Sequence, residues 1–557
     1  MQPQLDFATF IVAYNLGCLS CDVSRPQFHL SRARDGAGRY LPSGSVWVEE
    51  HFLARIPLLQ APMSQERLLY EPSPAVSVRV VQDGLAIMQE HAALLYHREP
   101  DSDRLFFSYC HPYGGKKDKV PLKIRYADVL WCEQDPEAAP DCVNLTFVHQ
   151  HTIHRMQVQV DIADFNHHDN DISSYILSHA YTNGLVQPSV YVLLNPHGGT
   201  GLAKTIYDKH IEKVLKAANA DVTYVETTYL GHATDLMREL DVSKYDIIVC
   251  CSGDGIPFEV INGFYARPDK GVSAFNKLAV TQLPCGSGNA LSLSTHGTDN
   301  AFDATVAMLK SQRAKLDLMA VTQGKGENAT TRLSFLSQCY GMIADADIGT
   351  EHLRWIGAVR FELGVLQKVL LRATYPCELW IDYATDTKQQ LREHYDDHLG
   401  VVAPLSETQS LAMNLKYPGL DSPPPSNWVK VDDQVASTLN QVYVGNLPYV
   451  SKGAQFFPAA LPNDHLMDLI MTTSKSSIRD TFSAILAVEK GTHVHNSNVY
   501  HAKIRGYRLI PKINGKGHYI SVDGESFPFE PYQVEVFPGV LTGLLTDSKF
   551  VATSYTS

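Results

Sequence analysis

Between residues 187 and 320, continuous apolar runs alternate with segments that have a helical period. Short apolar runs are typical of strands buried on both faces of a sheet, and the helical period indicates amphipathic helices. Strand, loop and helix in repeated succession predict right-handed crossovers and a parallel sheet, in an α/β lobe that we bound at 186–325. The expected strands are 190–194, 222–227, 246–251 and 278–283, and the expected helices are 202–218, 233–240, one from 257 and one from 289.

The preceding region, residues 60–185, has short runs rich in valine, isoleucine and aromatic residues. Such runs predict strands on a pleated surface, and a short amphipathic helix is predicted at 172–180. Several strands closed by one helix suggest a regulatory module, for which a pleckstrin-homology-like fold is our expectation. Residues 1–59 precede it as an N-terminal extension. The expected strands are 104–110, 120–133, 142–149 and 156–162.

Residues 326–557 become strand-rich again after one helical stretch predicted at 355–373. Within this region, residues 384–440 are polar and contain the run Ser-Pro-Pro-Pro-Ser at 422–426. Polar segments with proline and no apolar period bury too little surface to order themselves. We therefore predict a flexible insertion at 384–440.

Composition restricts the classes of protein to which the chain can belong. A length of 557 residues favours two to four domains, and 44% apolar with 19% charged residues is compatible with folding. The formal net charge of −13 argues against nucleic-acid binding. Ten cysteines without a disulfide framework favour reduced thiols in the cytoplasm, and no apolar run reaches the ~18 residues of a membrane span.

Glycine-rich loops follow three of the strands expected in the α/β lobe. They are 195–201 (Asn-Pro-His-Gly-Gly-Thr-Gly), 252–255 (Ser-Gly-Asp-Gly) and 284–289 (Pro-Cys-Gly-Ser-Gly-Asn). The carboxyl ends of parallel strands meet at one edge, where open α/β sheets bind ligands. Glycine lets backbone N–H groups approach phosphate oxygens, and helix N-termini add partial positive charge. One such loop could serve a tight turn alone, but three at equivalent strand ends predict a phosphate-binding cradle.

Other nucleotide-binding classes lack their motifs here. The chain has no G-x-x-x-x-G-K-[ST], residues 199–204 lack the third glycine of a dinucleotide fingerprint, and the protein-kinase motifs are absent. Asp254 lies between Gly253 and Gly255, where a hydroxyl acceptor can approach, and is our candidate catalytic carboxylate. The alternative is that Asp254 only forms the turn, the commoner role of a lone aspartate.

These motifs resemble a known family. Asn-Pro-x-x-Gly from Asn195, Ser-Gly-Asp-Gly-x-x-x-Glu-Val-x-Asn-Gly at 252–263 and Leu-Pro-x-Gly-Ser-Gly-Asn at 283–289 are similar to the diacylglycerol-kinase catalytic domain in its sphingosine-kinase branch. Within that branch the residues resemble fungal long-chain (sphingoid) base kinases most. The resemblance covers about 187–545 without 384–440, and it is vague over 60–185.

The resemblance implies an α/β nucleotide-binding lobe with a parallel sheet, followed by a C-terminal β-sandwich lobe that binds lipid. It implies a kinase that uses ATP and Mg²⁺ to phosphorylate the primary hydroxyl of sphingoid bases such as sphingosine, sphinganine and phytosphingosine. A diacylglycerol or ceramide kinase with the same cradle is the alternative enzyme, and a catalytically silent lipid-binding scaffold is the alternative from another class. We expect a cytoplasmic protein that contacts intracellular membranes reversibly; the oligomeric state and the residues that hold Mg²⁺ stay open.

The resemblance also implies roles for single residues of the cradle. Asp254 would take the proton of the lipid hydroxyl, and Ser252, Gly253 and Gly255 would contact the substrate beside it. His197 departs from the basic residue often seen at this position in the family. The residues implied in ATP binding are Asn195, Pro196, His197, Thr227, Gly231, Glu259, Gly286, Ser287, Gly288, Arg354, Arg360, Asp523, Gly524 and Glu525.

The segment between the implied lobes supplies further candidates. Asp347 would bind the polar head of the lipid, and Arg354 and Arg360 would hold ATP phosphates. A helix that starts near Asp347 places Asp347, Glu351 and Arg354 on one face, and a solvated charged stripe is the alternative. The loop 523–525 would return to the nucleotide and its Mg²⁺, with a plain turn as the alternative.

Overall fold

The computed structural model describes strands between residues 76 and 107 and, apart from short gaps, residues 123–160, 171–199, 201–350, 359–401, 410–513 and 517–556. Residues 74–557 form one compact unit. The N-terminal extension 1–59, Glu351 and Arg354 lie outside the described residues.

The predicted parallel sheet of the α/β lobe is confirmed. Its strands follow the order β10-β9-β11-β12, and each neighbouring pair is parallel. Strands β9, β11 and β12 are buried almost throughout, which explains their continuous apolar sequences. The elements are β9 (Ser189–Leu194), α3 (Ala203–Ile206), a π turn (Tyr207–Ile211), α4 (Glu212–Ala217), β10 (Asp221–Glu226), α5 (His232–Glu239), β11 (Ile247–Ser252), α6 (Gly255–Tyr265), α7 (Val272–Lys277), β12 (Ala279–Pro284), α8 (Ala290–His296) and α9 (Ala301–Lys310).

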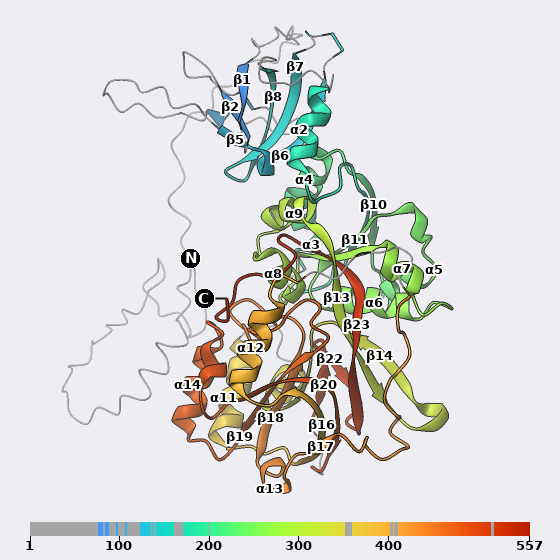
Figure 1. The fold of residues 1–557 in the computed structure, drawn as a ribbon, viewed down its shortest axis with the longest axis vertical. Helices are drawn as coiled ribbons and strands as arrows, with labels where there is room; N and C mark the ends of the chain where they lie inside the picture. Colours follow the sequence, from blue (N-terminus) through green and yellow to red (C-terminus); the bar gives the residue numbers. More distant parts are fainter. Residues whose placement is uncertain are drawn as a thin grey trace, which may run out of the picture. The chain divides into compact units, whose positions relative to one another are not determined.

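The second lobe is strand-rich and joins the first through the last strand of the chain. Strand β23 (Tyr532–Leu545) pairs with β12 where Val280 faces Gly543, and it runs antiparallel to β13 (Gln312–Gln323) over most of its length (Figure 1). Strand β13 ends just before the expected boundary at 325, and its partner β23 pairs with β12 of the first lobe and β20 (Tyr500–Pro511) of the second.

The helix predicted at 355–373 is present in this lobe as α11. The elements of the second lobe between β13 and β23 are β14 (Thr330–Ser334), β15 (Ser337–Gly341), α10 (Met342–Gly349), α11 (Val359–Leu370), β16 (Cys377–Thr385), α12 (Lys388–His398), β17 (Val429–Lys430), α13 (Asp433–Ala436), β18 (Leu439–Gly445), β19 (Met467–Thr473), α14 (Ile478–Ala487), the 3₁₀ turn η7 (Thr492–His495), β20 (Tyr500–Pro511), β21 (Ile520–Val522) and β22 (Glu525–Phe527).

The strand-rich N-terminal module has a six-stranded sheet of order β5-β2-β1-β8-β7-β6, followed in sequence by helix α2. Strands closed by one helix are as predicted, whereas the pleckstrin-homology-like fold stays a prediction. Its strands are β1 (Val76–Val81), β2 (Gly84–Ile87), β5 (Lys123–Arg125), β6 (Val129–Gln134), β7 (Cys142–His149) and β8 (Thr152–Val160), and its helix is α2 (Ile172–Ala180).

This module shares one hydrophobic core with the α/β lobe, although the sequence suggested a separate regulatory unit. Residues of both regions, such as Leu130 and Val192, belong to the same buried cluster. Lys310 of α9 donates hydrogen bonds to the carbonyl oxygens of Val129 and Ala180, and its ammonium lies 3.4 Å from the ring centroid of Tyr181. The module is therefore packed on the α/β lobe as part of one folded body.

The expected flexible insertion at 384–440 is wrong over its described residues. Helix α12 lies within it and buries Leu391 and Tyr395 in the core of the second lobe. Farther along, Trp428 is buried, and Arg508 donates to the carbonyl oxygens of Pro418, Gly419 and Ser422. Polar side chains of distant residues order this segment through hydrogen bonds and ion pairs. Because such pairing leaves no apolar period, the sequence of the segment looked like that of a flexible loop.

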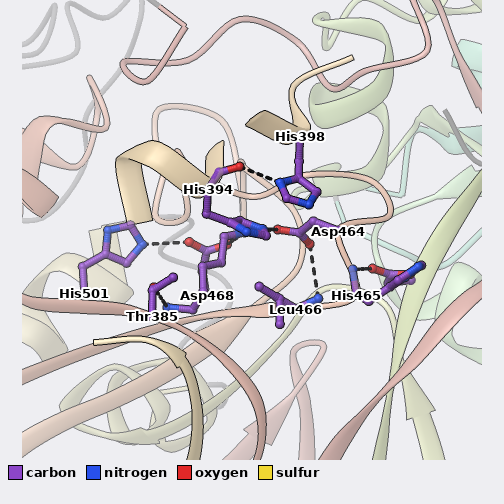
Figure 2. A network of polar contacts seen from close by, with 10 residues as sticks. Thr385, His394, His398, Asp464, His465, Leu466, Asp468 and His501 are labelled. Carbon is purple, nitrogen blue, oxygen red and sulfur yellow. Dashed lines mark hydrogen bonds and ion pairs between the residues drawn. The ribbon is translucent and has the colours of Figure 1, made fainter. Parts of the chain in front are cut away.

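A buried ionic network attaches this insertion to the sheet of the second lobe. Lys503 of β20 is fully buried, and its Nζ lies 2.8 Å from a carboxylate oxygen of both Asp464 and Asp468. Asp464 also pairs with His394 of α12 at 3.1 Å, and Asp468 with His501 at 2.7 Å (Figure 2). Burial alone lowers the pKa of a lysine, but the two carboxylates outweigh it and raise the pKa of Lys503.

We expect Lys503→Met to destabilise the protein by about 3–5 kcal/mol, because it leaves two buried carboxylates without their cation. The matched control is Lys452→Met, which removes a surface ion pair with Asp299 and should cost at most about 1 kcal/mol. Urea denaturation of both variants measures the difference. Equal small losses would show that the network contributes little to folding.

Candidate functional site

The three glycine-rich loops meet backbone to backbone at the carboxyl ends of β9, β11 and β12. A Cβ atom added to Gly286 would lie 2.3 Å from the backbone nitrogen of Gly253 and 2.4 Å from its Cα. A Cβ on Gly199 would lie 3.1 Å from the backbone nitrogen of Ser287. The sequence suggested glycine for phosphate approach, and the structure adds a second reason, because any side chain at Gly286 would force the loops apart.

The Asp254 carboxylate lies where these loops converge. Its Oδ1 accepts hydrogen bonds from the backbone N–H of Ala290, at 2.9 Å, and from Nε2 of Gln282, at 3.1 Å. Its Oδ2 lies 2.3 Å from the position that a Cβ on Gly288 would take. Although Asp254 precedes helix α6, its side chain does not cap that helix, so it does more than form its own turn.

The pKa of Asp254 is raised to about 6, mainly by burial and to a lesser extent by the charge of Asp347, against the hydrogen bonds from Ala290 and Gln282. A carboxylate with a pKa near the working pH is a stronger proton acceptor than an ordinary aspartate and is still mostly ionised. Asp254 has the properties of a general base.

Gln282 is a candidate positioning residue for Asp254 that sequence reasoning did not single out. Its side chain is fully buried, accepts a hydrogen bond from the backbone N–H of Ser292 at 3.1 Å and donates to Asp254. This fixes the amide and, through it, one oxygen of the carboxylate. The signal in the sequence was a polar residue within the apolar strand β12.

Glu259 and Thr227 position the loops and do not face open solvent. The two Glu259 carboxylate oxygens accept hydrogen bonds from the backbone N–H groups of Gly231 and Ala233, each at 3.0 Å. Gly231 has φ 89°, which favours glycine, and begins helix α5. Thr227 donates from its backbone to the carbonyl of Leu194 at 2.8 Å. Glu259 therefore holds the N-terminus of α5 beside the cradle.

The first loop is shaped by its own asparagine. Asn195 Oδ1 accepts a hydrogen bond from the backbone N–H of His197 at 3.0 Å, an Asx turn that carries Pro196. The His197 side chain is exposed at the rim of the loop. The structure thus brings Asn195, Pro196 and His197 to the edge of the sheet where Gly286 and Ser287 also lie.

The loop 523–525 is a hairpin turn that lies next to the start of α6. Asp523 and Gly524 have φ of 52° and 83° and connect β21 to β22. The buried Asp523 carboxylate accepts hydrogen bonds from the Ser334 hydroxyl and from three backbone N–H groups of 335–337, which fixes the hairpin. Glu525 Oε1 lies 3.3 Å from the position of a Cβ on Gly255, so this loop is close to the glycine loop that contains Asp254. Its role in binding the nucleotide or Mg²⁺ stays a prediction.

Helix α10 brings a second carboxylate near Asp254. The helix begins at Met342 and ends at Gly349, so the expected helix start near Asp347 is wrong. Asp347 lies in its last turn, and its charge raises the pKa of Asp254, which shows that the two are neighbours. Arg360 lies in α11, and its side chain is outside the described part of the structure.

Asp345, two residues before Asp347, is committed to the fold. Its buried carboxylate accepts from Lys368 of α11 and from the Tyr375 hydroxyl, at 2.8 and 2.7 Å. It also accepts from the backbone N–H of Tyr519 at 3.1 Å. Asp345 therefore fixes α10 against α11 and the second lobe, and Asp347 is the better candidate for ligand contact.

A mainly apolar cavity lies beside helix α10, whose residues Met342 and Ile343 line it. Tyr443 also lines it, and burial raises the pKa of that tyrosine, with lesser effects from the charges of Asp347 and Asp254. The helix that carries Asp347 therefore also forms part of the wall of the cavity. The lining of the cavity comes from α10, α11, β18, β19, α14 and η7 and includes Met342, Val365, Tyr443, Phe456, Ile470, Ala484, Ile485, Val488, His493 and Val499.

No helix among the described residues is long and apolar enough to cross a membrane. No three of their histidine, cysteine, aspartate and glutamate side chains converge in a way that could hold a metal ion. A second cavity, of about 580 Å³ and with a mixed polar and apolar lining, lies between residues 412–417 and strands β20 and β23, and contains none of the predicted site residues.

Comparison with known proteins identifies the family. The diacylglycerol kinase catalytic domain matches residues 189–321, and the YegS C-terminal NAD kinase beta sandwich-like domain matches residues 423–545. Sphingoid long chain base kinase 4 of Schizosaccharomyces pombe is 32% identical over 425 residues, which cover 76% of this chain and 88% of that protein. This chain belongs to the sphingoid long-chain base kinase family.

Two further relatives support that membership and confirm the resemblance seen in the motifs. Sphingoid long chain base kinase 5 of Saccharomyces cerevisiae is 38% identical over 443 residues, which cover 70% of this chain and 64% of that protein. The chain thus spans less than two thirds of this relative. Human sphingosine kinase 1 is 29% identical over 63% of this chain and 88% of its own length.

We expect Gly286→Ala to destabilise this kinase-family protein by about 1–3 kcal/mol, because the new Cβ would overlap the backbone of Gly253. The control is Gly419→Ala, since nothing lies within 4 Å of a Cβ at that position. Thermal denaturation of the two variants measures the effect. A Gly286→Ala protein as stable as the control would contradict the close packing of the loops.

Proposed function

We propose that this chain transfers the γ-phosphoryl group of ATP to the primary hydroxyl of a sphingoid long-chain base. The observation that carries the proposal is the position of Asp254. It lies where three glycine loops converge, and helix α10, which carries Asp347, also lines an apolar cavity. A phosphate donor and a lipid acceptor would meet at this carboxylate. The names of the similar proteins agree with this reaction.

We assign nucleotide binding to the loops. The backbone N–H groups of Gly198, Gly253 and Gly288 and their neighbours can approach phosphate oxygens without obstruction by side chains. Glu259 and Thr227 would act by holding the loops in place, as their hydrogen bonds indicate. The remaining residues of the assignment are Asn195, Pro196, His197, Gly231, Gly286, Ser287, Arg354, Arg360, Gly524 and Glu525, with Asp523 as the support of its hairpin.

The cradle also fits a magnesium ion carried by the nucleotide. Glu525 is the carboxylate next to the start of α6, at Gly255, and would hold the ion or a water bound to it. When bound, Mg²⁺ neutralises charge on the phosphates during transfer. Because no larger ligand set occurs among the described residues, most of the remaining ligands would be phosphate oxygens and water.

Asp254 would act as the general base. Gln282 and the Ala290 N–H hold Oδ1, which leaves Oδ2 as the oxygen that accepts the proton of the lipid hydroxyl. As that proton leaves, the hydroxyl oxygen forms its bond to the γ-phosphorus, and the bond from phosphorus to the bridging oxygen of ADP breaks. Burial supports this step, because it makes the carboxylate more basic than aspartate in water.

Asp347 and the cavity would select the lipid. A sphingoid base carries an ammonium group beside its primary hydroxyl, and a carboxylate at the mouth of the cavity attracts it. The apolar lining then accepts the hydrocarbon chain. Since this substrate is a membrane lipid, we propose that the protein works from the cytoplasm by reversible contact with a membrane surface.

We expect Asp254→Asn to lose about 10²–10⁴-fold in kcat while ATP binding persists, because a general base is removed and the loops stay intact. In the wild type, kcat/KM for the sphingoid base should decrease as the pH is lowered through about 6, where Asp254 becomes protonated. Removing the like charge in Asp347→Asn should move this acid limb to lower pH. Radiolabelled ATP transfer across pH 5–8 provides the measurement, and near-normal turnover by Asp254→Asn would reject its role as base.

We expect the wild type to phosphorylate sphinganine in preference to ceramide and diacylglycerol, which lack the ammonium group. A charge-assisted hydrogen bond contributes ~1.5–3 kcal/mol, so Asp347→Asn should reduce this preference roughly 10- to 150-fold. Asp345→Asn is the control, since it should lower stability and leave the preference unchanged. Equal use of diacylglycerol and sphinganine by the wild type would leave only a general lipid kinase.

A further inference from the structure

The apolar cavity contains one polar atom without a partner among the described residues. His493, in the turn η7, lines the cavity and is 3% exposed. Its Nε2 lies 3.1 Å from the carbonyl oxygen of Phe456, whereas its buried Nδ1 makes no hydrogen bond. Buried polar atoms are nearly always paired, so an unpaired one on a cavity wall points to a group that the cavity receives.

The hydrogen bond from His493 Nε2 to the Phe456 carbonyl determines whether Nδ1 is a donor or an acceptor. Burial lowers the pKa of His493 to about 3, so the ring is neutral at physiological pH. A neutral imidazole has one donor and one acceptor nitrogen, and a carbonyl oxygen can only accept. Nε2 must therefore donate to Phe456, and Nδ1 is left as an acceptor that needs a hydrogen-bond donor.

Three polar side chains of the cavity wall direct a donor elsewhere. The Thr472 hydroxyl donates to the side chain of Asn440, and the Gln441 amide donates to the sulfur of Cys339 at 2.8 Å. The Thr481 hydroxyl donates at 3.1 Å to a carbonyl at the start of its own helix. Since no donor of the described residues pairs with His493 Nδ1, a bound ligand can supply one.

The place of His493 limits where on the ligand this donor sits. Its ring centroid is 5.6 Å from that of Phe456, which is 5.0 Å from that of Tyr443. Tyr443 of β18 pairs with Cys339 of β15, the strand that leads directly into helix α10 with Asp347. If the head of the lipid binds at Asp347 as proposed, His493 is two ring contacts from the end of the cavity beside α10, and the first carbons of the lipid would pass it.

We propose that His493 Nδ1 accepts a hydrogen bond from a hydroxyl on the first carbons of the lipid chain, and that His493 thereby selects 4-hydroxylated bases over unhydroxylated ones. The inference rests on the proposed function and names the preferred substrate of the same site. The proposed path from Asp254 to His493 consists of a hydrogen bond of about 2.8 Å at each end and the three carbon–carbon bonds between the first and fourth carbons of the lipid. Its length is of the same order as the two ring contacts between His493 and Tyr443. A site built around a substrate hydroxyl rejects the analogue without it, because its buried acceptor is left unpaired.

The test compares kcat/KM for 4-hydroxysphinganine and sphinganine in the wild type and in His493→Phe. The wild type should prefer the hydroxylated base by roughly 5- to 100-fold, the range expected when a buried acceptor is left unpaired. His493→Phe keeps a ring and removes the acceptor, so the ratio should fall to about one, through loss on the hydroxylated base. Activity on sphinganine should stay the same or rise.

Two further variants make the result decisive. His493→Asn places an amide oxygen near the position of Nδ1 and should keep part of the preference, and it decides the question if the phenylalanine variant fails to fold. Val488→Ala alters the same cavity without removing a polar atom, so the ratio should stay at the wild-type value. Circular dichroism and melting curves check the fold of each variant.

A wild-type ratio near one, or the same ratio in wild type and both His493 variants, would overturn the inference. Either result would mean that Nδ1 holds only a water molecule. A wild type that phosphorylates neither base would instead reject the proposed function itself. The two failures are therefore distinguishable in the same assay.

Discussion

The contact between the glycine loops is the constraint on which the site depends. Gly286 and Gly253 approach so closely that no Cβ fits between them, and Gly288 leaves room for the Asp254 carboxylate. The strand register beneath them makes this possible, since Ser252 of β11 pairs with Pro284 of β12 and both loops start at one level. This backbone packing also holds Asp254 against the N-terminus of α8, where the backbone N–H of Ala290 donates to its carboxylate.

Much of this arrangement could be predicted from sequence because the signals were local. A strand buried on both faces is a continuous apolar run, and helices α5, α6 and α8 follow within a few residues of the expected positions. Glycine at three strand ends indicated convergence, because parallel strands end at one edge. The Asp523-Gly524 turn was also readable, since both residues tolerate positive φ.

The features that sequence reasoning missed depend on partners far apart in the chain. Gln282 is separated from Asp254 by 28 residues, and the order of 384–440 depends on Asp464 and Arg508. Neither pairing leaves a periodic pattern in the sequence. The sequence of a polar segment held by distant hydrogen bonds therefore resembles that of a flexible one. The shared core of the N-terminal module was hidden for the same reason, because a strand sequence does not reveal which surface covers it.

Two carboxylates near one cavity raise the question of how their tasks are divided. Burial is the larger cause of the raised pKa of Asp254, and the charge of Asp347 is a lesser one. If an ammonium group binds Asp347 as proposed, it offsets only this lesser effect, and burial still keeps Asp254 basic. The base strength of Asp254 would then depend little on which lipid is bound. Asp347 would therefore act mainly on substrate affinity and only slightly on proton transfer, which largely separates recognition of the lipid from the chemistry performed on it.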